Sequence, residues 1–147
     1  MINKFSLDNK KAKKILPKRP ENANKGTFGR VLIIAGSRKM VGCCELAVSG
    51  AFRCGVGLVT LAFPDCIYDT VTLRLTENTF MPLPSHNGEL SKECITELLN
   101  EVNNFDVVVF GCGLGRSSDI KEILGELILK SRKPLIIDAD GLNALAE

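Results

Sequence analysis

Four short apolar runs constrain the fold of this chain more than any other feature. They are rich in β-branched residues, each ends at a turn that contains glycine, proline or aspartate, and they cover residues 30–35, 58–63, 106–110 and 134–138. Continuous apolar runs of this length are typical of strands that a parallel sheet buries on both faces. Because helix-like segments separate them, we predict a three-layer α/β/α domain with a mostly parallel sheet, whose ligands bind beyond the carboxyl ends of the strands.

The segments between these runs carry helical patterns. Residues 41–54 place small side chains on one helical face, which predicts a close approach to the sheet; these are Cys43, Ala47, Gly50, Ala51 and Cys54. Ser91 is suited to cap a second helix, whose apolar positions follow the i, i+3, i+4, i+7 spacing; they are Ile95, Leu98, Leu99 and Val102. A third helix, capped near Ser117 or Ser118, has an apolar face made of Ile120, Ile123, Leu124, Leu127 and Ile128.

Weaker patterns fill the remaining chain. They predict a helix around residues 7–16, irregular structure at 17–20, a helical stretch at 65–75, a short strand at 79–83, a loop at 84–88, and a last helix that begins at Gly141 with Asp140 as a candidate cap. We therefore expect two regions. Residues 1–24 form a basic N-terminal arm, and residues 25–147 belong to a single α/β domain.

Charge and cysteine content exclude several classes of function. The net charge is +2 with no tryptophan and one tyrosine, so nucleic acid is not an expected partner. Seven lysines and two arginines lie within the first 30 residues, which indicates either a solvated arm or bases placed near a polyphosphate. The six cysteines form no C-x-x-C pair and the single histidine, His86, lies in a polar loop, so we predict no zinc site and assign no metal ligand. Free thiols, no signal peptide and no apolar run of membrane-spanning length predict a cytoplasmic protein without a membrane partner.

Three turns rich in glycine or aspartate follow three of the predicted strands, at residues 36–44, 111–115 and 138–143. Since the carboxyl ends of parallel strands meet at one edge of a sheet, we expect the turns to form one site. Their glycines expose backbone N–H groups that favour phosphate, although glycine also serves purely conformational needs in such turns. Their spacing excludes a P-loop and disfavours a dinucleotide-binding fingerprint. Asp138 and Asp140 can coordinate Mg²⁺, orient ligand hydroxyls or cap the following helix.

Five motifs, in order along the chain, resemble those of the NAD(P)H-hydrate dehydratase family. They are KGTFGRVLIIAGS at 25–37, MVGCCELA at 40–47, RCGVGLV at 53–59, FGCGLG at 110–115 and PLIIDADGLN at 134–143. The chain departs from the family pattern at a few positions: Cys43 and Cys44 stand for two alanines, Cys112 for a proline, and Asn24 for a frequent histidine. The resemblance spans residue 19 to the C-terminus.

The resemblance implies a ribokinase-like fold and a carbon–oxygen lyase that uses ADP or ATP, with Mg²⁺, to remove water from hydrated NADH or NADPH. It implies that one set of residues binds the substrate: Cys43, Gly113, Gly115, Asp138, Asp140 and Asn143. We assign a second set to nucleotide phosphate: Lys25, Gly26, Gly36 and Ser37. No catalytic residue is assigned.

The family's Thr-Pro-His-Pro-Gly-Glu segment and its Gly-x-Gly-Asp motif, which carries the catalytic base, have no counterpart in these 147 residues. We therefore expect an N-terminal part of an incomplete ribokinase-like domain, inactive alone and prone to associate through an open sheet edge. We expect the complete protein to be a homo-oligomer. Two alternatives stay open, a ribokinase-like kinase of a carbohydrate or vitamin precursor, and a non-catalytic binding module.

Overall fold

The structure, a computed structural model, describes residues 8–15 and 20–146. Helix α1 (Asn9–Ile15) lies within the predicted first helix. The ends of that prediction at residues 7 and 16, and most of the predicted break at 17–20, lie outside the described residues. A short 3-10 turn, η1 (Lys25–Phe28), leads into the domain, and the capping box of Asn24 and Thr27 fixes its start.

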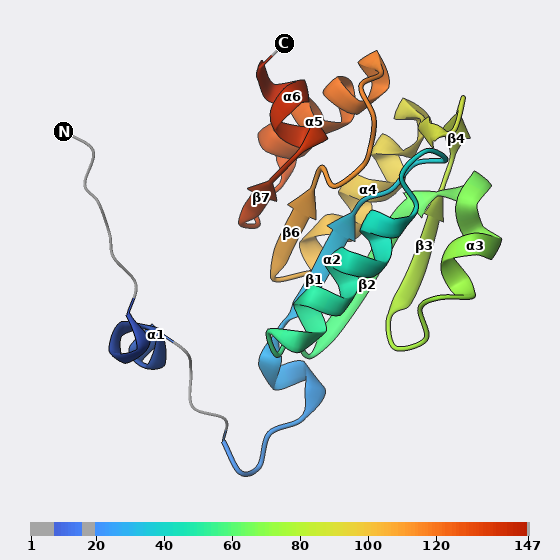
Figure 1. Ribbon diagram of the computed structural model, residues 1–147. Helices are drawn as coiled ribbons and strands as arrows, with labels where there is room; N and C mark the ends of the chain where they lie inside the picture. The colour runs from blue at the N-terminus through green and yellow to red at the C-terminus, as the bar shows by residue number, and fades with distance from the viewer. Residues whose placement is uncertain (1–7, 16–19, 147) are drawn as a thin grey trace.

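A five-stranded parallel sheet forms the centre of the molecule, in the order β3-β2-β1-β6-β7 (Figure 1). The strands are β1 (Arg30–Ile34), β2 (Leu58–Pro64), β3 (Thr79–Leu83), β6 (Val107–Phe110) and β7 (Leu135–Ile137). The register pairs Arg30 with Leu58 on one side of β1 and Val31 with Val107 on the other. The predicted strands and their parallel arrangement are confirmed.

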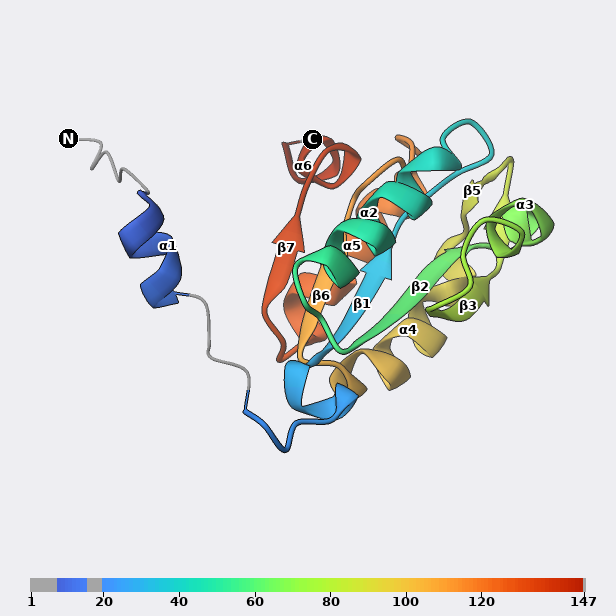
Figure 2. The same ribbon diagram turned by 60° about the horizontal axis from the view of Figure 1, so that its bottom comes forward.

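Helices cover both faces of this sheet (Figures 1 and 2). On one face lie α2 (Gly42–Arg53) and α3 (Tyr68–Thr72), which follows the 3-10 turn η2 (Asp65–Ile67). On the other lie α4 (Ile95–Glu101), between the 3-10 turns η3 (Lys92–Cys94) and η4 (Val102–Asn104), and α5 (Ser118–Lys130). The last helix is α6 (Asp140–Ala146). The predicted α/β/α architecture is confirmed.

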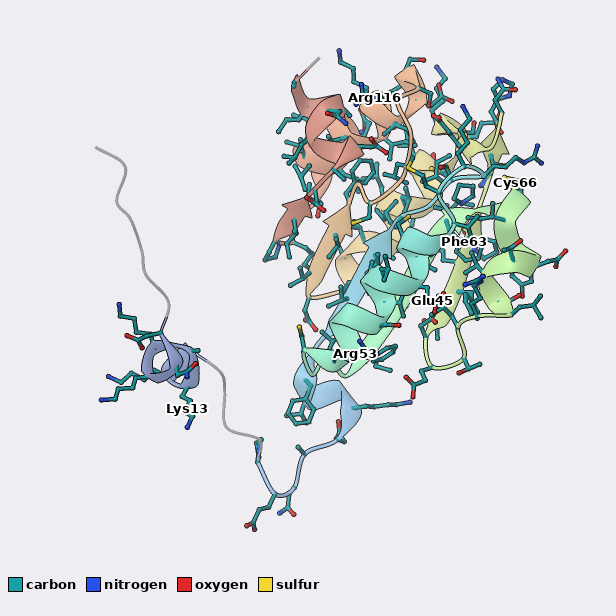
Figure 3. All side chains as sticks on the ribbon, viewed as in Figure 1. Lys13, Glu45, Arg53, Phe63, Cys66 and Arg116 are labelled. Atoms are coloured by element: carbon teal, nitrogen blue, oxygen red, sulfur yellow. The ribbon has the colours of Figure 1, made fainter. Side chains whose placement is uncertain are left out.

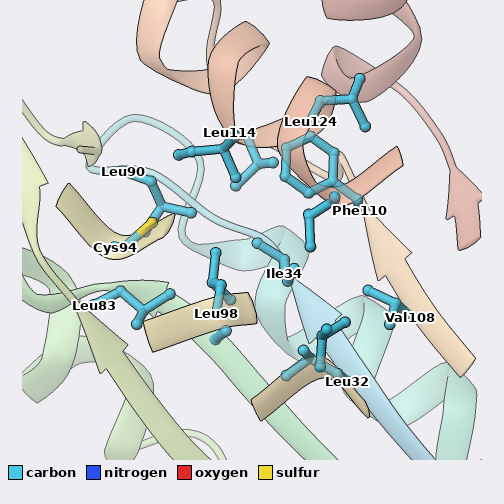
Figure 4. Packing of buried hydrophobic residues seen from close by; sticks show 14 of the residues in the cluster. Leu32, Ile34, Leu83, Leu90, Cys94, Leu98, Val108, Phe110, Leu114 and Leu124 are labelled. Carbon is cyan, nitrogen blue, oxygen red and sulfur yellow. The ribbon is translucent and has the colours of Figure 1, made fainter. Parts of the chain in front are cut away.

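The period of two along each strand divides the buried side chains between two cores. In β1, Leu32 and Ile34 point to the α4 and α5 side, whereas Ile33 and Ala35 point to the α2 and α3 side. Figure 4 shows the first core, where Phe110 and Leu124 pack beside Ile34. Both cores are apolar and closely packed, which stabilises the sheet by roughly 25 cal/mol for each Å² of apolar surface removed from water.

Two predicted helix faces are partly wrong. In α2 the buried residues are Cys44 and Val48, whereas Gly50 and Cys54 are exposed. The helix turns its larger apolar side chain inward because burial of that side chain gains more than burial of glycine. In α5, Ile128 is 45% exposed although the rest of its predicted face is buried.

The end of the sheet at β7 is also more open than predicted. A strand buried on both faces was expected there, but Ile136 is 54% exposed, as are Leu142 (50%) and Leu145 (55%) of α6. These apolar side chains of the edge strand and of the last helix are therefore left uncovered in the described chain. The strand order places β7 at one edge of the sheet, as the prediction of an open edge requires.

Residues 84–88, predicted as a loop, begin a β-hairpin. Strands β4 (Ser85–His86) and β5 (Glu89–Leu90) pair antiparallel around Asn87 and Gly88, both of which have positive φ. Asn-Gly between two strands is the preferred sequence of a type I′ turn. The hairpin lies beyond the carboxyl ends of the strands, next to the site described below.

Candidate functional site

The three predicted turns meet at the carboxyl edge of the sheet, where the strand order reverses between β1 and β6. The turn after β1 bonds directly to the turn after β6: the Gly36 amide donates to the Cys112 carbonyl at 2.9 Å, and the Gly111 amide to the Ile34 carbonyl at 3.2 Å. The third turn joins through Asp138, whose amide donates to the Phe110 carbonyl at 3.0 Å. The predicted convergence of the turns is confirmed, and this reversal point is where sheets of this type bind ligands.

Cys43 lies at the centre of this edge. Its half-buried thiol lies 2.9 Å from the Met40 carbonyl oxygen and 3.0 Å from the Cys112 carbonyl oxygen, and it can donate its one proton to either. It also fills the space in front of Gly113: a Cβ at that glycine, whose φ is +69°, would lie 2.4 Å from the Cys43 sulfur. The α2 start and the β6 turn are therefore packed together through one sulfur atom.

The neighbouring thiols differ in acidity. The hydrogen bond with Cys44 lowers the pKa of Cys43, whereas the same bond, together with burial, raises the pKa of Cys44. Burial and the nearby Asp138 carboxylate raise the pKa of Cys112. Cys44 and Cys112 therefore stay protonated at neutral pH, and of the three Cys43 is the one favoured as a thiolate.

Asp140 holds the last two turns together. Its carboxylate accepts from the Gly115 amide at 3.0 Å and from the Asn143 side-chain amide at 3.2 Å. Asp140 is the first residue of α6, so it does not cap a helix that begins at Gly141, as one prediction had it. Three of the predicted substrate-binding residues are thus brought into direct contact, and both carboxylate oxygens of Asp140 already have partners.

Asp138 is exposed, and its carboxylate meets the Cys112 thiol at 3.8 Å. Within residues 8–15 and 20–146 no group of three or more histidine, cysteine, aspartate or glutamate side chains is placed to hold a metal ion. With Asp140 engaged and Asp138 alone, the described residues do not build a Mg²⁺ site by themselves. Mg²⁺ often keeps several waters and one or two carboxylates beside substrate phosphates, and Asp138 has the free carboxylate for such a role.

The four residues assigned to nucleotide phosphate fall into two places. Gly36 and Ser37 lie at the carboxyl edge, both buried, and the Ser37 hydroxyl is buried without a hydrogen-bond partner in the described chain. Lys25 and Gly26 lie in η1, which precedes β1 and therefore sits at the opposite, amino edge of the sheet (Figure 1). The structure does not bring the two pairs together within one chain.

A cleft with a volume of about 550 Å³ adjoins Gly115. It is lined by the β1–α2 loop, the β4–β5 hairpin and the start of α5, through Lys39, His86, Asn87, Glu89, Leu90, Arg116, Ser117, Ser118 and Asp119. Sequence reasoning had set His86 aside and did not single out Lys39, Glu89 or Arg116. The signal that could have found this wall is the Asn87-Gly88 dipeptide, which predicts a hairpin.

The chain is similar in sequence to a family of known enzymes. The sequence profile of the family described as NAD(P)H-hydrate dehydratase matches residues 31–147. The bifunctional NAD(P)H-hydrate repair enzyme of Moorella thermoacetica is 37% identical over 89% of this chain and 25% of its own length. The ADP-dependent (S)-NAD(P)H-hydrate dehydratase of Listeria monocytogenes is 31% identical over 90% of this chain and 45% of its own length.

Solved structures show the same fold. A ribokinase-like superfamily protein from Enterococcus faecalis superposes with a TM-score of 0.80 at 24% identity, covering 95% of this chain and 47% of that one. The ADP/ATP-dependent NAD(P)H-hydrate dehydratase of Bacillus subtilis, co-crystallized with ATP/Mg²⁺, gives a TM-score of 0.72 at 24% identity, covering 90% and 45%. The chain thus spans a quarter of the Moorella relative and less than half of these structures.

No helix in the described part is long and apolar enough to span a membrane.

Proposed function

Because the chain belongs to the NAD(P)H-hydrate dehydratase family, we propose that it forms the substrate side of an enzyme that repairs hydrated NADH or NADPH. The reaction is loss of water from the hydrated nicotinamide ring, driven by ADP or ATP, which makes the enzyme a carbon–oxygen lyase. The names of the Moorella and Listeria relatives support this substrate and this reaction. We further propose that the protein acts in the cytoplasm.

The observation that carries the proposal is the geometry of the β6 turn. Gly111, Gly113 and Gly115 all have positive φ, and the turn that they form lies where the strand order reverses. The amides of Cys112 and Gly113 find no acceptor among the described residues, unlike those of Gly111 and Gly115. Two backbone N–H donors that lack an acceptor in the described chain, at the carboxyl edge of the sheet, suit the oxygen atoms of a polar, hydroxylated ring.

The thiol of Cys43 and the carboxylate of Asp140 then have positioning roles. Cys43 packs against Gly113 and so limits how closely the turn after β6 approaches α2, while Asp140 accepts from the Gly115 amide and so connects the turn to α6. We propose that Asp138, which is exposed at the same edge, faces the phosphates of ADP or ATP and their Mg²⁺. When bound, the nucleotide supplies the phosphoryl group that makes a ring hydroxyl a good leaving group.

An absorbance assay tests the proposal. The product of the complete gene is mixed with hydrated NADH or NADPH, Mg²⁺, and either ADP or ATP, and recovery of the absorbance of the reduced nicotinamide is followed. We expect recovery that requires the adenine nucleotide. A protein that leaves the hydrates unchanged but phosphorylates a carbohydrate or vitamin precursor would instead be a ribokinase-like kinase, and one that does neither would be a binding module.

A further inference from the structure

Two cations that form no ion pair within the described chain line the cleft beside Gly115. They are Lys39 of the β1–α2 loop and Arg116 before α5, and both are exposed. Neither forms an ion pair with any residue in the described ranges, where the three ion pairs join other side chains. His86 of the hairpin lines the same space.

The two carboxylates of the cleft are already engaged. Glu89 accepts from the Ser117 amide at 3.1 Å, and Asp119 accepts from the Lys92 amide at 3.1 Å. A carboxylate keeps its negative charge when it accepts from a backbone N–H group, so the formal charges of these four side chains sum to zero. Each carboxylate is nevertheless oriented toward a backbone donor and pairs with neither Lys39 nor Arg116. Both cations therefore keep all their N–H donors for the oxygen atoms of an added phosphate.

The start of α5 adds donors to the same cleft. α5 has 13 residues, and Ser117 has the extended backbone of an N-cap although its side chain makes no capping bond. The Ser117 hydroxyl is buried without a partner in the described chain, and the amides of Ser118 and Asp119 have no acceptor there. The first amides of a long helix, together with its partial positive charge, bind phosphate readily.

The cleft is also continuous with the proposed substrate site. Glu89 packs directly against Gly115, so the hairpin wall begins where the β6 turn ends. The hairpin is held in place from the other side, because the Arg38 amide donates to the Gly88 carbonyl at 2.8 Å. A volume of about 550 Å³ is in the range of small-molecule sites and has room for the nucleotide half of a dinucleotide.

We infer that this cleft binds a phosphate group of the dinucleotide substrate, with Arg116 and Lys39 as its cationic ligands and the first amides of α5 as further donors. The inference rests on the proposed function, which supplies the dinucleotide. Two parts of the substrate share this chemistry: the diphosphate bridge, which NAD and NADP both have, and the 2′-phosphate, which only NADP has.

Direct binding of NAD⁺ and NADP⁺ tests the inference without catalysis. Dissociation constants are measured by calorimetry on the complete gene product, as wild type and as Arg116→Ala and Lys39→Ala. Arg53→Ala is the matched control, because Arg53 is an exposed arginine at the opposite end of the sheet from Arg116 (Figure 3). Melting temperatures confirm that each variant is folded. We expect each cleft variant to bind about tenfold more weakly, since a charge-assisted hydrogen bond contributes on that scale.

The pattern of losses decides the outcome. Weaker binding of NADP⁺ alone assigns the cleft to the 2′-phosphate, and equally weaker binding of both assigns it to the diphosphate. Unchanged binding in both cleft variants, no binding by the wild type, or an equal loss in Arg53→Ala would overturn the inference. The dehydratase assay is independent of this test. If the protein binds NADP⁺ through Arg116 but does not convert the hydrates to NADH or NADPH, the phosphate site stands and the proposed function fails.

Discussion

Substitution of Gly113 by alanine tests the packing at the centre of the candidate site. The φ of +69° places this residue in the left-handed region, which costs an alanine about 1–2 kcal/mol. The new Cβ would also lie 2.4 Å from the Cys43 sulfur and 3.0 Å from the Met40 Cβ, and overpacking of this kind costs about 1–3 kcal/mol. We therefore expect Gly113→Ala to lower the free energy of unfolding by roughly 2–5 kcal/mol.

The two contributions can be separated by removing the sulfur. Cys43→Ala alone costs about 1 kcal/mol, because a half-buried thiol and its weak hydrogen bond are lost. In that background Gly113→Ala should cost only about 1–2 kcal/mol, which leaves a coupling energy of roughly 1–3 kcal/mol between the two positions. Urea unfolding followed by circular dichroism measures all four proteins of the cycle. An equal cost of Gly113→Ala with and without the Cys43 sulfur would refute the packing described here.

Three further perturbations follow from the structure. Asp140→Ala leaves the Gly115 amide without its charged acceptor and should lower the unfolding free energy by about 1–3 kcal/mol in urea titrations. A change below about 0.5 kcal/mol, the usual scale for surface sites, would show that the bond is unimportant. Burial raises the pKa of Cys94 to about 12, above its ordinary 9.0, so the unfolded chain loses the thiol proton first and the free energy of unfolding should fall as the pH rises between these values. Cys94→Ala should make that fall smaller. An unchanged dependence of the unfolding free energy on pH in this variant would contradict the buried thiol. Ile136→Lys, at an exposed position of β7, should reduce self-association of the 147-residue chain in sedimentation velocity, while its melting temperature stays within a few degrees of the wild type. Undiminished association would show that the chain associates through another surface.

The strands were predictable because burial on both faces leaves a strong trace in sequence. The run that ends at Ala35 coincides with β1 to within a residue, and the run before Pro64 coincides with β2. Convergence of the three turns followed from the parallel arrangement alone. The order of the strands did not follow, because each run is compatible with any place in the sheet until tertiary packing decides it.

Helix faces and short elements were less predictable. The helix α2 has small or apolar residues on more than one face, so the spacing alone does not predict which face is buried. The larger side chain of Val48 is buried, and Gly50 is not. The hairpin was missed because its strands have two residues each, too few for a periodic signal, although Asn87-Gly88 carried the turn chemistry. The roles of Lys39 and Arg116 depend on distant segments that meet only in the folded chain.

The sites assigned from motifs divide in the same way. Cys43, Gly113, Asp140 and Asn143 meet as expected because each follows the carboxyl end of a strand or begins the next helix. Lys25 precedes β1, so it lies at the other edge of the sheet. The strand predicted at residues 30–35 already separated Lys25 from Gly36, and the assignment of both to one phosphate site did not take the length of that strand into account.

The strand order has a consequence for how the chain folds. Pairing of β1 with β2 closes a short loop, but Arg30 and Asp106, which join the amino ends of β1 and β6, are 76 residues apart. Closing the longer loop costs roughly 1 kcal/mol more in chain entropy, and long-range parallel pairing is slow. We therefore expect the pairing of β1 with β6 to form late, after the segments on either side have folded locally. A ligand that contacts the turns after both strands would bind only the completed sheet, and it would therefore raise the melting temperature of the protein.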